Sequence, residues 1–346
     1  MAPRNRASWL KEKQSPQNVV DDAPYTEPST NELVIKTAAT AINPADFMIQ
    51  KLGILINEYP AILGCDVVGQ VVQVHPSLAD KFEIGDRVVG AAQPLRPKGD
   101  CYCYSAFQDY VVLQAPCIAK IPNDVPYKDA VVLPLAFNTA ASCLFTAETL
   151  ELPGPKMPMP ESGINGHFIV WGASSSVGAC AVQLATAAGY AVIGVGSTKN
   201  HGMIQDAGAV KAFDQANSSI VYDISEYLRG KEVVGAFLAV NSEDALKAMC
   251  KILDSVGGKK FISSVVPGSE AWATAGVKVT TNFMTGSESR LQCQDAVWPW
   301  LNEAMERGEM KYLPKPQVVG NGLGDIQKAC DLLEKGVSAK KLVVLI

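Results

Sequence analysis

One segment in the middle of the chain constrains its fold more than any other. The apolar run Phe168-Ile-Val-Trp171 leads directly into Gly172-Ala-Ser-Ser-Ser-Val-Gly178, and an alanine-rich, helix-length segment follows at 179–188. A strand that enters a turn of small residues at a helix start brings backbone N–H groups and the positive end of the helix dipole together, which favours pyrophosphate binding. Gly172 would form the tight turn, and Gly178 would let the helix pack closely on the strand. The segment therefore predicts a dinucleotide-binding loop.

The loop departs from the usual pattern at one position, which leaves a second interpretation open. The pattern G-x-G-x-x-G has a central glycine, where this sequence has Ser175 or Ser176. Serine is small and its hydroxyl can donate to a phosphate, so we expect Ser174, Ser175, Ser176 and Val177 to contact the cofactor with the two glycines. In the alternative interpretation the serines only cap an ordinary helix.

The surrounding alternation of strands and helices favours dinucleotide binding. Apolar runs predict strands at 168–171, 191–195, 233–240 and 260–263, and the segments between them predict helices at 177–188, 200–207, 218–229 and 242–254. Such alternation forms βαβ units and a parallel, doubly wound sheet. The first third of the chain instead has short β-rich runs separated by Gly, Pro and Asp, which predict a barrel-like module. The predicted fold class is α/β with a second, β-rich domain.

Residues 196–201, after the second predicted strand, indicate which coenzyme binds. Enzymes that use NAD usually have Asp or Glu about 20 residues past the glycines, where it accepts a hydrogen bond from the ribose 2′-hydroxyl. This sequence has Gly-Ser-Thr-Lys-Asn-His there and no acid. A carboxylate would repel a 2′-phosphate, whereas Ser197 and Lys199 can donate to it. The segment predicts NADPH, and a solvated turn with an incidental lysine is the alternative.

Composition and charge exclude several classes of protein. The net charge of −5 and the pI of 5.4 oppose binding to nucleic acid or an anionic membrane. No apolar run approaches the roughly 20 residues of a membrane span, and the basic N-terminus lacks the apolar stretch of a secretory signal. The nine cysteines are odd in number and irregularly spaced, which predicts reduced thiols. We expect a cytoplasmic protein.

Several motifs together resemble a known superfamily. Asn43-Pro-Ala-Asp46, Leu63-Gly-Cys-Asp-Val-Val-Gly-Gln-Val71, Phe82-Glu-Ile-Gly-Asp-Arg-Val88 and the loop at 172–178 follow the order and spacing of medium-chain dehydrogenases/reductases. Within them the chain resembles the quinone oxidoreductase and enoyl reductase branch. The form Trp-Gly-Ala-Ser-Ser-Ser-Val-Gly is most similar to fungal reductases of secondary metabolism, including enoyl reductases that act in trans on polyketide synthases. The resemblance implies a GroES-like catalytic domain at 1–130 and 285–346, and a Rossmann domain at 131–284.

The same resemblance allows a test for catalytic zinc. Alcohol dehydrogenases of the superfamily bind zinc through a Cys, a His followed by Glu, and a later Cys. This sequence has Asn43 at the first position and Cys65-Asp66 at the second, and no Cys occurs in 133–138. A catalytic site needs three protein ligands, and Cys101 and Cys103 are too few for a structural zinc lobe. We predict no metal, which favours reduction of an activated alkene over oxidation of a simple alcohol.

The resemblance also implies roles for individual residues. Asn43 and Asp46 would lie on a loop that faces the nicotinamide, and the Thr139 hydroxyl would contact it. Lys340 and Lys341 match a position where relatives have a basic residue near the cofactor. The alternatives are an Asn-Pro turn, a helix-interior threonine bonded to its own backbone and a charged strand entry. No side chain is identified as the general acid.

Together these observations predict an NADPH-dependent, zinc-independent reductase of an activated C=C bond. The substrate would be a small molecule or an acyl chain on a carrier protein, with a polyketide synthase as a possible partner, and the chain would be a monomer or homodimer. Reduction of a quinone, imine or carbonyl remains an alternative of the same fold. A non-catalytic NADPH-binding homologue is the alternative from another class.

Overall fold

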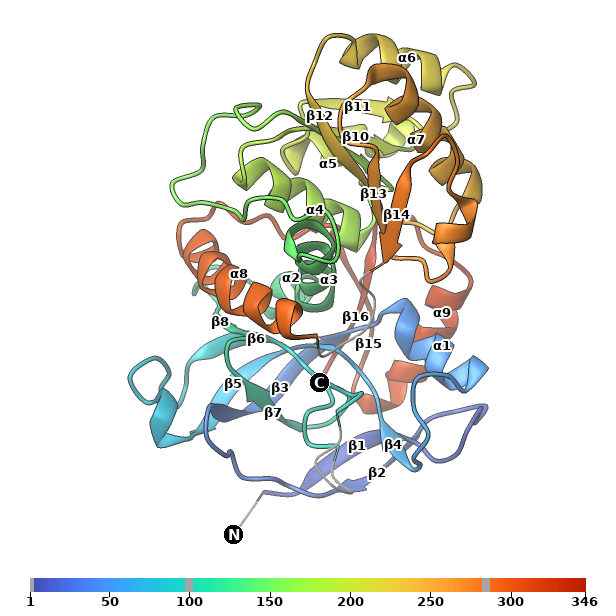
Figure 1. Ribbon diagram of the computed structural model, residues 1–346. Helices are drawn as coiled ribbons and strands as arrows, with labels where there is room; N and C mark the ends of the chain where they lie inside the picture. Colours follow the sequence, from blue (N-terminus) through green and yellow to red (C-terminus); the bar gives the residue numbers. More distant parts are fainter. Residues whose placement is uncertain (1–2, 97–101, 282–286) are drawn as a thin grey trace. The chain divides into compact units, whose positions relative to one another are not determined.

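The computed structural model describes residues 3–96, 102–281 and 287–346, and the chain divides into two compact units (Figure 1). The first unit comprises Met1–Leu135 and Lys315–Ile346, and the second comprises Ala136–Pro314. Among the described residues, no helix is long and apolar enough to cross a membrane.

The second unit is built on a six-stranded sheet in the order β11-β10-β9-β12-β13-β14. The strands are β9 (His167–Trp171), β10 (Ala191–Gly196), β11 (Lys211–Asp214), β12 (Val233–Leu238), β13 (Phe261–Ser264) and β14 (Lys278–Thr281). Every neighbouring pair is parallel. In chain order this is 3-2-1-4-5-6, the order of dinucleotide-binding sheets. The predicted doubly wound sheet is confirmed, whereas β11 was not predicted.

Helices cover both faces of this sheet. They are α4 (Ser176–Ala187), α5 (His201–Asp206), α6 (Ile220–Leu228) and α7 (Glu243–Val256). The apolar faces of α6 and α7 form one core with alternate residues of the strands, such as Ile169 and Ile193. Gly194, which lies between Ile193 and Val195 on β10, points to the other face, where a side chain would meet Ile204 of α5. The alternation of strand residues therefore decides which helix packs on which face.

Three further helices lie outside these strand–helix repeats: α2 (Tyr127–Ala130), which belongs to the first unit, and α3 (Pro134–Phe145) and α8 (Glu288–Glu306). The indole N–H of Trp298 donates to Asn138 Oδ1 at 2.8 Å, and the rings of Trp298 and Trp300 contact Phe137. These contacts place α8 with the second unit. The predicted Rossmann domain ended at 284, a boundary that lies outside the described residues.

Within its described residues, the first unit has two β-sheets. A seven-stranded sheet has the order β15-β16-β3-β5-β6-β8, with β7 paired to β3, and a smaller sheet has the order β2-β1-β4. The large sheet comprises β3 (Glu32–Ala41), β5 (Asp66–Val74), β6 (Arg87–Ala91), β7 (Tyr110–Gln114), β8 (Ile118–Lys120), β15 (Pro316–Asn321) and β16 (Lys341–Leu345). The small sheet comprises β1 (Asn5–Leu10), β2 (Val19–Ala23) and β4 (Ala61–Ile62). The β-rich first module is thus confirmed, and its last strands come from the end of the chain.

Two helices and the 3₁₀ turns complete the described structure. The helices α1 (Pro44–Leu52) and α9 (Ile326–Glu334) belong to the first unit and contact each other. The 3₁₀ turns are η1 (Pro76–Leu78), η2 (Thr198–Asn200), η3 (Ser269–Trp272) and η4 (Leu323–Asp325). Helix α1 corrects the expectation that Asn43 and Asp46 lie on a loop, because Asp46 falls in its first turn and Asn43 is its N-cap. Proline at the first helical position is well tolerated, since no intrahelical acceptor exists there for an N–H.

Candidate functional site

The loop at 172–178 has the close backbone approaches that the sequence predicts. Gly172 has a φ of +79°, a conformation that favours glycine, and a Cβ there would lie 2.5 Å from Val240 Cγ1. A Cβ on Gly178 would lie 2.2 Å from the carbonyl oxygen of Gly172. Both glycines are therefore required by the geometry: the first by the turn and the second by contact between helix and strand.

The serines of the loop have separate structural roles. Ser175 is the N-cap of α4, where its Oγ accepts from the Gly178 N–H at 3.0 Å and donates to the Ala239 carbonyl at 3.3 Å. Ser174 Oγ accepts from Asn200 Nδ2 at 3.2 Å. The helix-cap interpretation is thus correct for Ser175, and it does not exclude anion binding.

The amino terminus of α4 retains donors for an anion. Ser176 and Val177 are its first two residues, and N–H groups at these positions have no acceptor within a helix. Both residues are half-buried. The helix dipole adds positive potential at the same point. This end of α4 can therefore bind a phosphate group through its backbone.

The turn after β10 carries the residues that the sequence assigns to a 2′-phosphate. Ser197 is half-buried and its Oγ accepts from Gln215 Nε2 at 3.3 Å, while Lys199 is exposed on η2. A carboxylate that the sequence argument missed lies on the neighbouring strand, because Asp214 pairs with Gly196. The Ala216 N–H and the Thr198 side chain donate to it and lower its pKa. Finding Asp214 from sequence would have required recognising β11.

A buried cluster in the first unit brings together Asn43, Asp66 and Lys341. Lys341 Nζ lies 2.8 Å from Asp66 Oδ2 and donates to Asn43 Oδ1 at 2.5 Å. Asn43 Nδ2 donates to Asp66 Oδ2 at 2.8 Å, and the Leu135 N–H donates to Asp66 Oδ1 at 2.6 Å. We call Asn43, Asp66 and Lys341 the charge triangle. Both polar atoms of the Asn43 side chain are engaged, so a hydrogen bond from it to a ligand would have to displace one of these contacts.

Asp46 lies beside the charge triangle and is almost completely buried. Its Oδ2 accepts from the Asn43 N–H at 2.8 Å, which fixes the first turn of α1. Burial raises the pKa of Asp46 to about 7, although the N–H groups of Asn43 and Gly64 lower it. Near neutral pH this carboxyl is therefore divided between its neutral and charged forms.

The other predicted residues are Thr139 and the two adjacent lysines, Lys340 and Lys341. Thr139 is half-buried on α3 in the second unit, and its neighbour Asn138 accepts from Trp298. Of the two lysines that match the basic position, Lys340 is exposed and Lys341 is buried in the charge triangle. The sequence could not distinguish them, because adjacent strand residues point to opposite faces and the register was unknown.

The donor set at the charge triangle does not fit catalytic zinc. Asn43 Oδ1 and Asp66 Oδ2 already contact the ammonium of Lys341, and the histidine ligand position is occupied by Cys65. Within the described residues, no three His, Cys, Asp or Glu side chains come together as a metal-binding group. Cys101, which was considered together with Cys103 as a ligand of a structural zinc lobe, lies outside those residues. An amide, an ion-paired carboxylate and a lysine are a poor ligand set for zinc.

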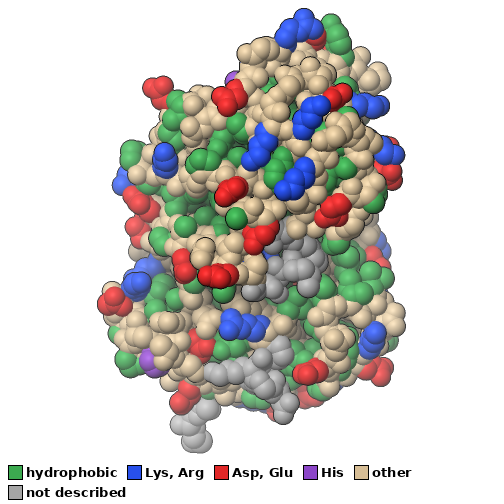
Figure 2. All heavy atoms as spheres, viewed as in Figure 1, with side chains coloured by type: hydrophobic (Ala, Val, Ile, Leu, Met, Phe, Trp, Pro, Cys, Tyr) green, Lys and Arg blue, Asp and Glu red, His purple; other side chains and the backbone are tan. Residues whose placement is uncertain are grey.

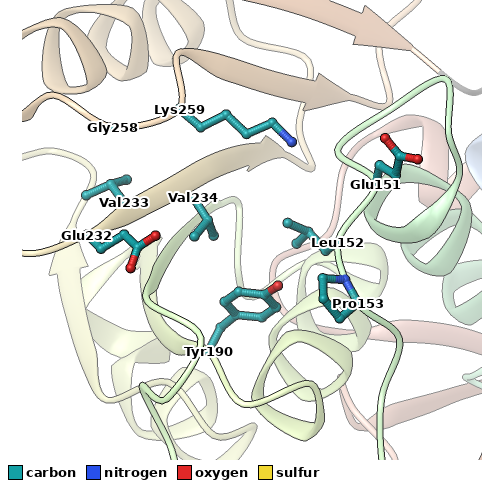
Figure 3. Close-up of a pocket in the computed structure, with 9 residues that line it drawn as sticks. All are labelled: Glu151, Leu152, Pro153, Tyr190, Glu232, Val233, Val234, Gly258 and Lys259. Atoms are coloured by element: carbon teal, nitrogen blue, oxygen red, sulfur yellow. The ribbon is translucent and has the colours of Figure 1, made fainter.

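A pocket of about 310 Å³ opens elsewhere in the second unit (Figure 3). Tyr190, Val233 and Lys259, which line it, lie at or just before the starts of β10, β12 and β13. The pocket is thus at the amino ends of the strands, whereas the loop at 172–178 follows a carboxyl end. Nucleotides bind at the carboxyl ends of such sheets, so this pocket is not the dinucleotide site. On the face drawn in Figure 2, both basic and acidic side chains are visible.

Comparison with known proteins agrees with this architecture. Residues 29–123 match the family model of the alcohol dehydrogenase GroES-like domain. The chain is 36% identical to "Dehydrogenase pigH" of Monascus ruber over 99% of both chains, and 32% identical to "Trans-enoyl reductase himH" of Aspergillus japonicus over 98% of this chain and 97% of that protein.

Solved structures show the same fold. The enoyl reductase CurK superposes with a TM-score of 0.75 at 18% identity over 99% of both chains. Mycobacterial Rv1454c, solved in complex with NADPH, superposes with a TM-score of 0.67 at 22% identity over 99% of this chain and 100% of that one.

Proposed function

Because this chain belongs to the medium-chain dehydrogenase/reductase superfamily, we propose that it is an NADPH-dependent, zinc-independent enoyl reductase. The observation that carries the proposal is the loop at 172–178, with two obligatory glycines followed by the amino terminus of α4, where the first N–H groups have no acceptor within the helix. It follows the first strand of a sheet with the order 3-2-1-4-5-6, where dinucleotides bind.

The cofactor would lie along the carboxyl ends of the strands in the second unit. Gly172, Gly178 and the intervening Ser174, Ser175, Ser176 and Val177 would hold the pyrophosphate. Ser197 and Lys199 would hold the 2′-phosphate, and Lys340 would add positive charge. The negative charge of Asp214 would oppose binding of a 2′-phosphate, but its carboxylate already accepts hydrogen bonds from the Ala216 N–H and the Thr198 side chain. The NADPH complex of Rv1454c supports the same coenzyme by analogy.

The chemistry requires hydride transfer to the β-carbon of a double bond conjugated to a carbonyl. Bound NADPH would supply the hydride, and the electron pair of the double bond would move toward the carbonyl oxygen, giving an enolate that takes a proton at the α-carbon. Conjugation stabilises the enolate, so hydrogen-bond donors can replace a Lewis acid. We assign the Thr139 hydroxyl as a donor near the nicotinamide. Asn43 and Asp46 are also proposed as site residues, and they would act through the first turn of α1.

The substrate would be an α,β-unsaturated thioester, either small or attached to a carrier protein. The name of the himH relative, a trans-enoyl reductase, supports this class. A polyketide synthase is the corresponding partner. The net charge of −5 argues against nucleic acid as a partner, and we propose a cytoplasmic location.

A substrate panel with the purified full chain tests the proposal. NADPH and NADH oxidation would be followed with enoyl thioesters, enones, quinones, imines and aldehydes. Turnover of enoyl thioesters or enones, with NADPH preferred, is the expected result. Turnover confined to quinones, imines or aldehydes would assign the alternative chemistry, and tight coenzyme binding without turnover of any class would favour the non-catalytic alternative.

A further inference from the structure

A lysine and an aspartate are buried together in the first unit. Lys341 is 4% exposed and Asp66 is completely buried, with Nζ and Oδ2 separated by 2.8 Å. They come from β16 and β5, near opposite ends of the chain. A charged pair in such a place is costly to desolvate and is maintained only where the geometry satisfies both partners. Its presence therefore needs a reason beyond packing.

Asn43 completes the pair with both atoms of its amide. Its Oδ1 accepts from Lys341 Nζ and its Nδ2 donates to Asp66 Oδ2 at 2.8 Å. The second oxygen of Asp66 accepts from the Leu135 N–H. The orientation of the Asn43 amide is thus determined at both ends. Asn43 is also the N-cap of α1, so the triangle holds the start of that helix.

The same two positions correspond to the metal centre in the alcohol dehydrogenase pattern. Asn43 occupies the place of the first cysteine ligand, and Asp66 the place of the acid beside the histidine ligand. In this chain the positive charge at that point is the ammonium of Lys341, with contacts to both residues. A divalent cation there would meet a like charge in a poorly solvated site, where repulsion is strong. The ammonium and a metal ion therefore exclude each other.

We propose that Lys341 is a positioning residue that takes the electrostatic place of the metal and holds Asn43 and the start of α1 in their working geometry. The inference rests on the proposed function, because that function includes Asn43 and Asp46 among the residues of the site. Lys341 itself touches neither cofactor nor substrate in this proposal. It acts through Asn43 and Asp66.

The test uses Lys341→Met, Asp66→Asn and the double variant, with exposed Lys335→Met as the matched control. Each single substitution leaves one buried charge without its partner, so the melting temperature should fall by roughly 6–20 °C. The double variant removes both charges and should recover most of that loss. Because Asn43 has then lost its fixed orientation, kcat should stay about 10–100-fold below wild type with KM little changed. Lys335→Met should match wild type.

Metal content and kcat decide the two parts of the proposal. Wild-type protein dialysed against zinc should retain only substoichiometric metal by elemental analysis, and stoichiometric zinc would overturn the charge-substitution argument. A Lys341→Met protein with wild-type stability and kcat would overturn it as well. Recovery of kcat together with stability in the double variant would reduce Lys341 to a folding role and reject positioning.

These outcomes are separate from failure of the proposed function. If no substrate class is reduced by wild type, the enoyl reductase proposal fails. The thermal coupling between Lys341 and Asp66, and the zinc content, still support or reject the charge substitution, because neither measurement needs a substrate.

Discussion

Substituting Gly178 by alanine tests directly whether the loop at 172–178 binds the coenzyme. A Cβ at this position would lie 2.2 Å from the carbonyl oxygen of Gly172, and the next nearest atoms, in Gly172 and Ala173, are also backbone. No side-chain rotation can relieve the clash. The loop and the start of α4 must separate by about 1 Å before the contact becomes an ordinary one.

The required movement should affect both stability and binding. Overpacking of this size costs about 1–3 kcal/mol, which corresponds to a decrease in melting temperature of roughly 2–12 °C. The same movement shifts the N–H groups of Ser176 and Val177, which are the proposed phosphate donors. A displacement of about 1 Å in a preorganised site can cost up to 10²-fold. We therefore expect the Kd for NADPH to rise by about 10–100-fold.

Fluorescence titration with NADPH and thermal denaturation measure these two effects. Gly202→Ala is the matched control, since Gly202 lies in α5 and a Cβ there meets no atom within 4 Å. In a helix that change should be neutral or stabilise by about 0.5–1 kcal/mol. The assignment of the loop would be refuted if the Gly178→Ala protein stayed folded and its Kd for NADPH lay within about twofold of the wild-type value. That ratio corresponds to a difference in binding free energy below about 0.5 kcal/mol.

Three further changes test other parts of the structure. The pKa of Asp46 is about 7 in the folded protein, whereas an unfolded aspartate has a pKa near 4. Between these values the folded state binds more protons than the unfolded state. The free energy of unfolding should therefore fall by up to about 1.4 kcal/mol per pH unit between pH 5 and 7. Asp46→Asn should remove this slope in urea denaturation, and a persisting slope would show that another group is responsible. Replacing Ser197 and Lys199 by alanine should raise the KM for NADPH far more than that for NADH, and equal changes would reject the 2′-phosphate site. Trp298→Phe removes the buried donor to Asn138 and should lower the free energy of unfolding by about 1–3 kcal/mol; an unchanged denaturation midpoint would show that this bond does not stabilise the second unit.

The parallel sheet was predictable because consecutive residues indicate each of its buried strands and the helices between them. Each buried strand between 168 and 263 is a short apolar run, and each helix between them is bounded by small or polar residues. The strand β11 was missed because Lys-Ala-Phe-Asp is short and only half-buried, so it has no apolar run to detect. Its pairing with β10 supplies the stability that its sequence does not indicate.

The helix α1 was missed for a different reason. Asn43-Pro44 is typical of a turn, and this dipeptide was given more weight than the apolar residues Phe47, Met48, Ile49 and Leu52 that follow it. The same two residue types also begin helices, with asparagine as N-cap and proline at the first position. Asp46 decides between these structures, because its carboxylate accepts from the Asn43 N–H at 2.8 Å and closes the first turn. The spacing of Asn43 and Asp46 was visible in the sequence, but its meaning depends on whether that bond forms.

The loop at 172–178 in the second unit and the charge triangle in the first unit differ in predictability because they are assembled differently. The loop at 172–178 consists of consecutive residues, so its spacing alone determines which atoms approach each other. The charge triangle joins Asn43 to Lys341, which are 298 residues apart, through the register of β16 against β3. A shift of that register by one residue would turn Lys340 inward and Lys341 outward. Sequence could therefore indicate a basic residue at this place but not which lysine carries the charge, and the identity of that lysine determines whether it serves a cofactor phosphate or replaces a metal ion.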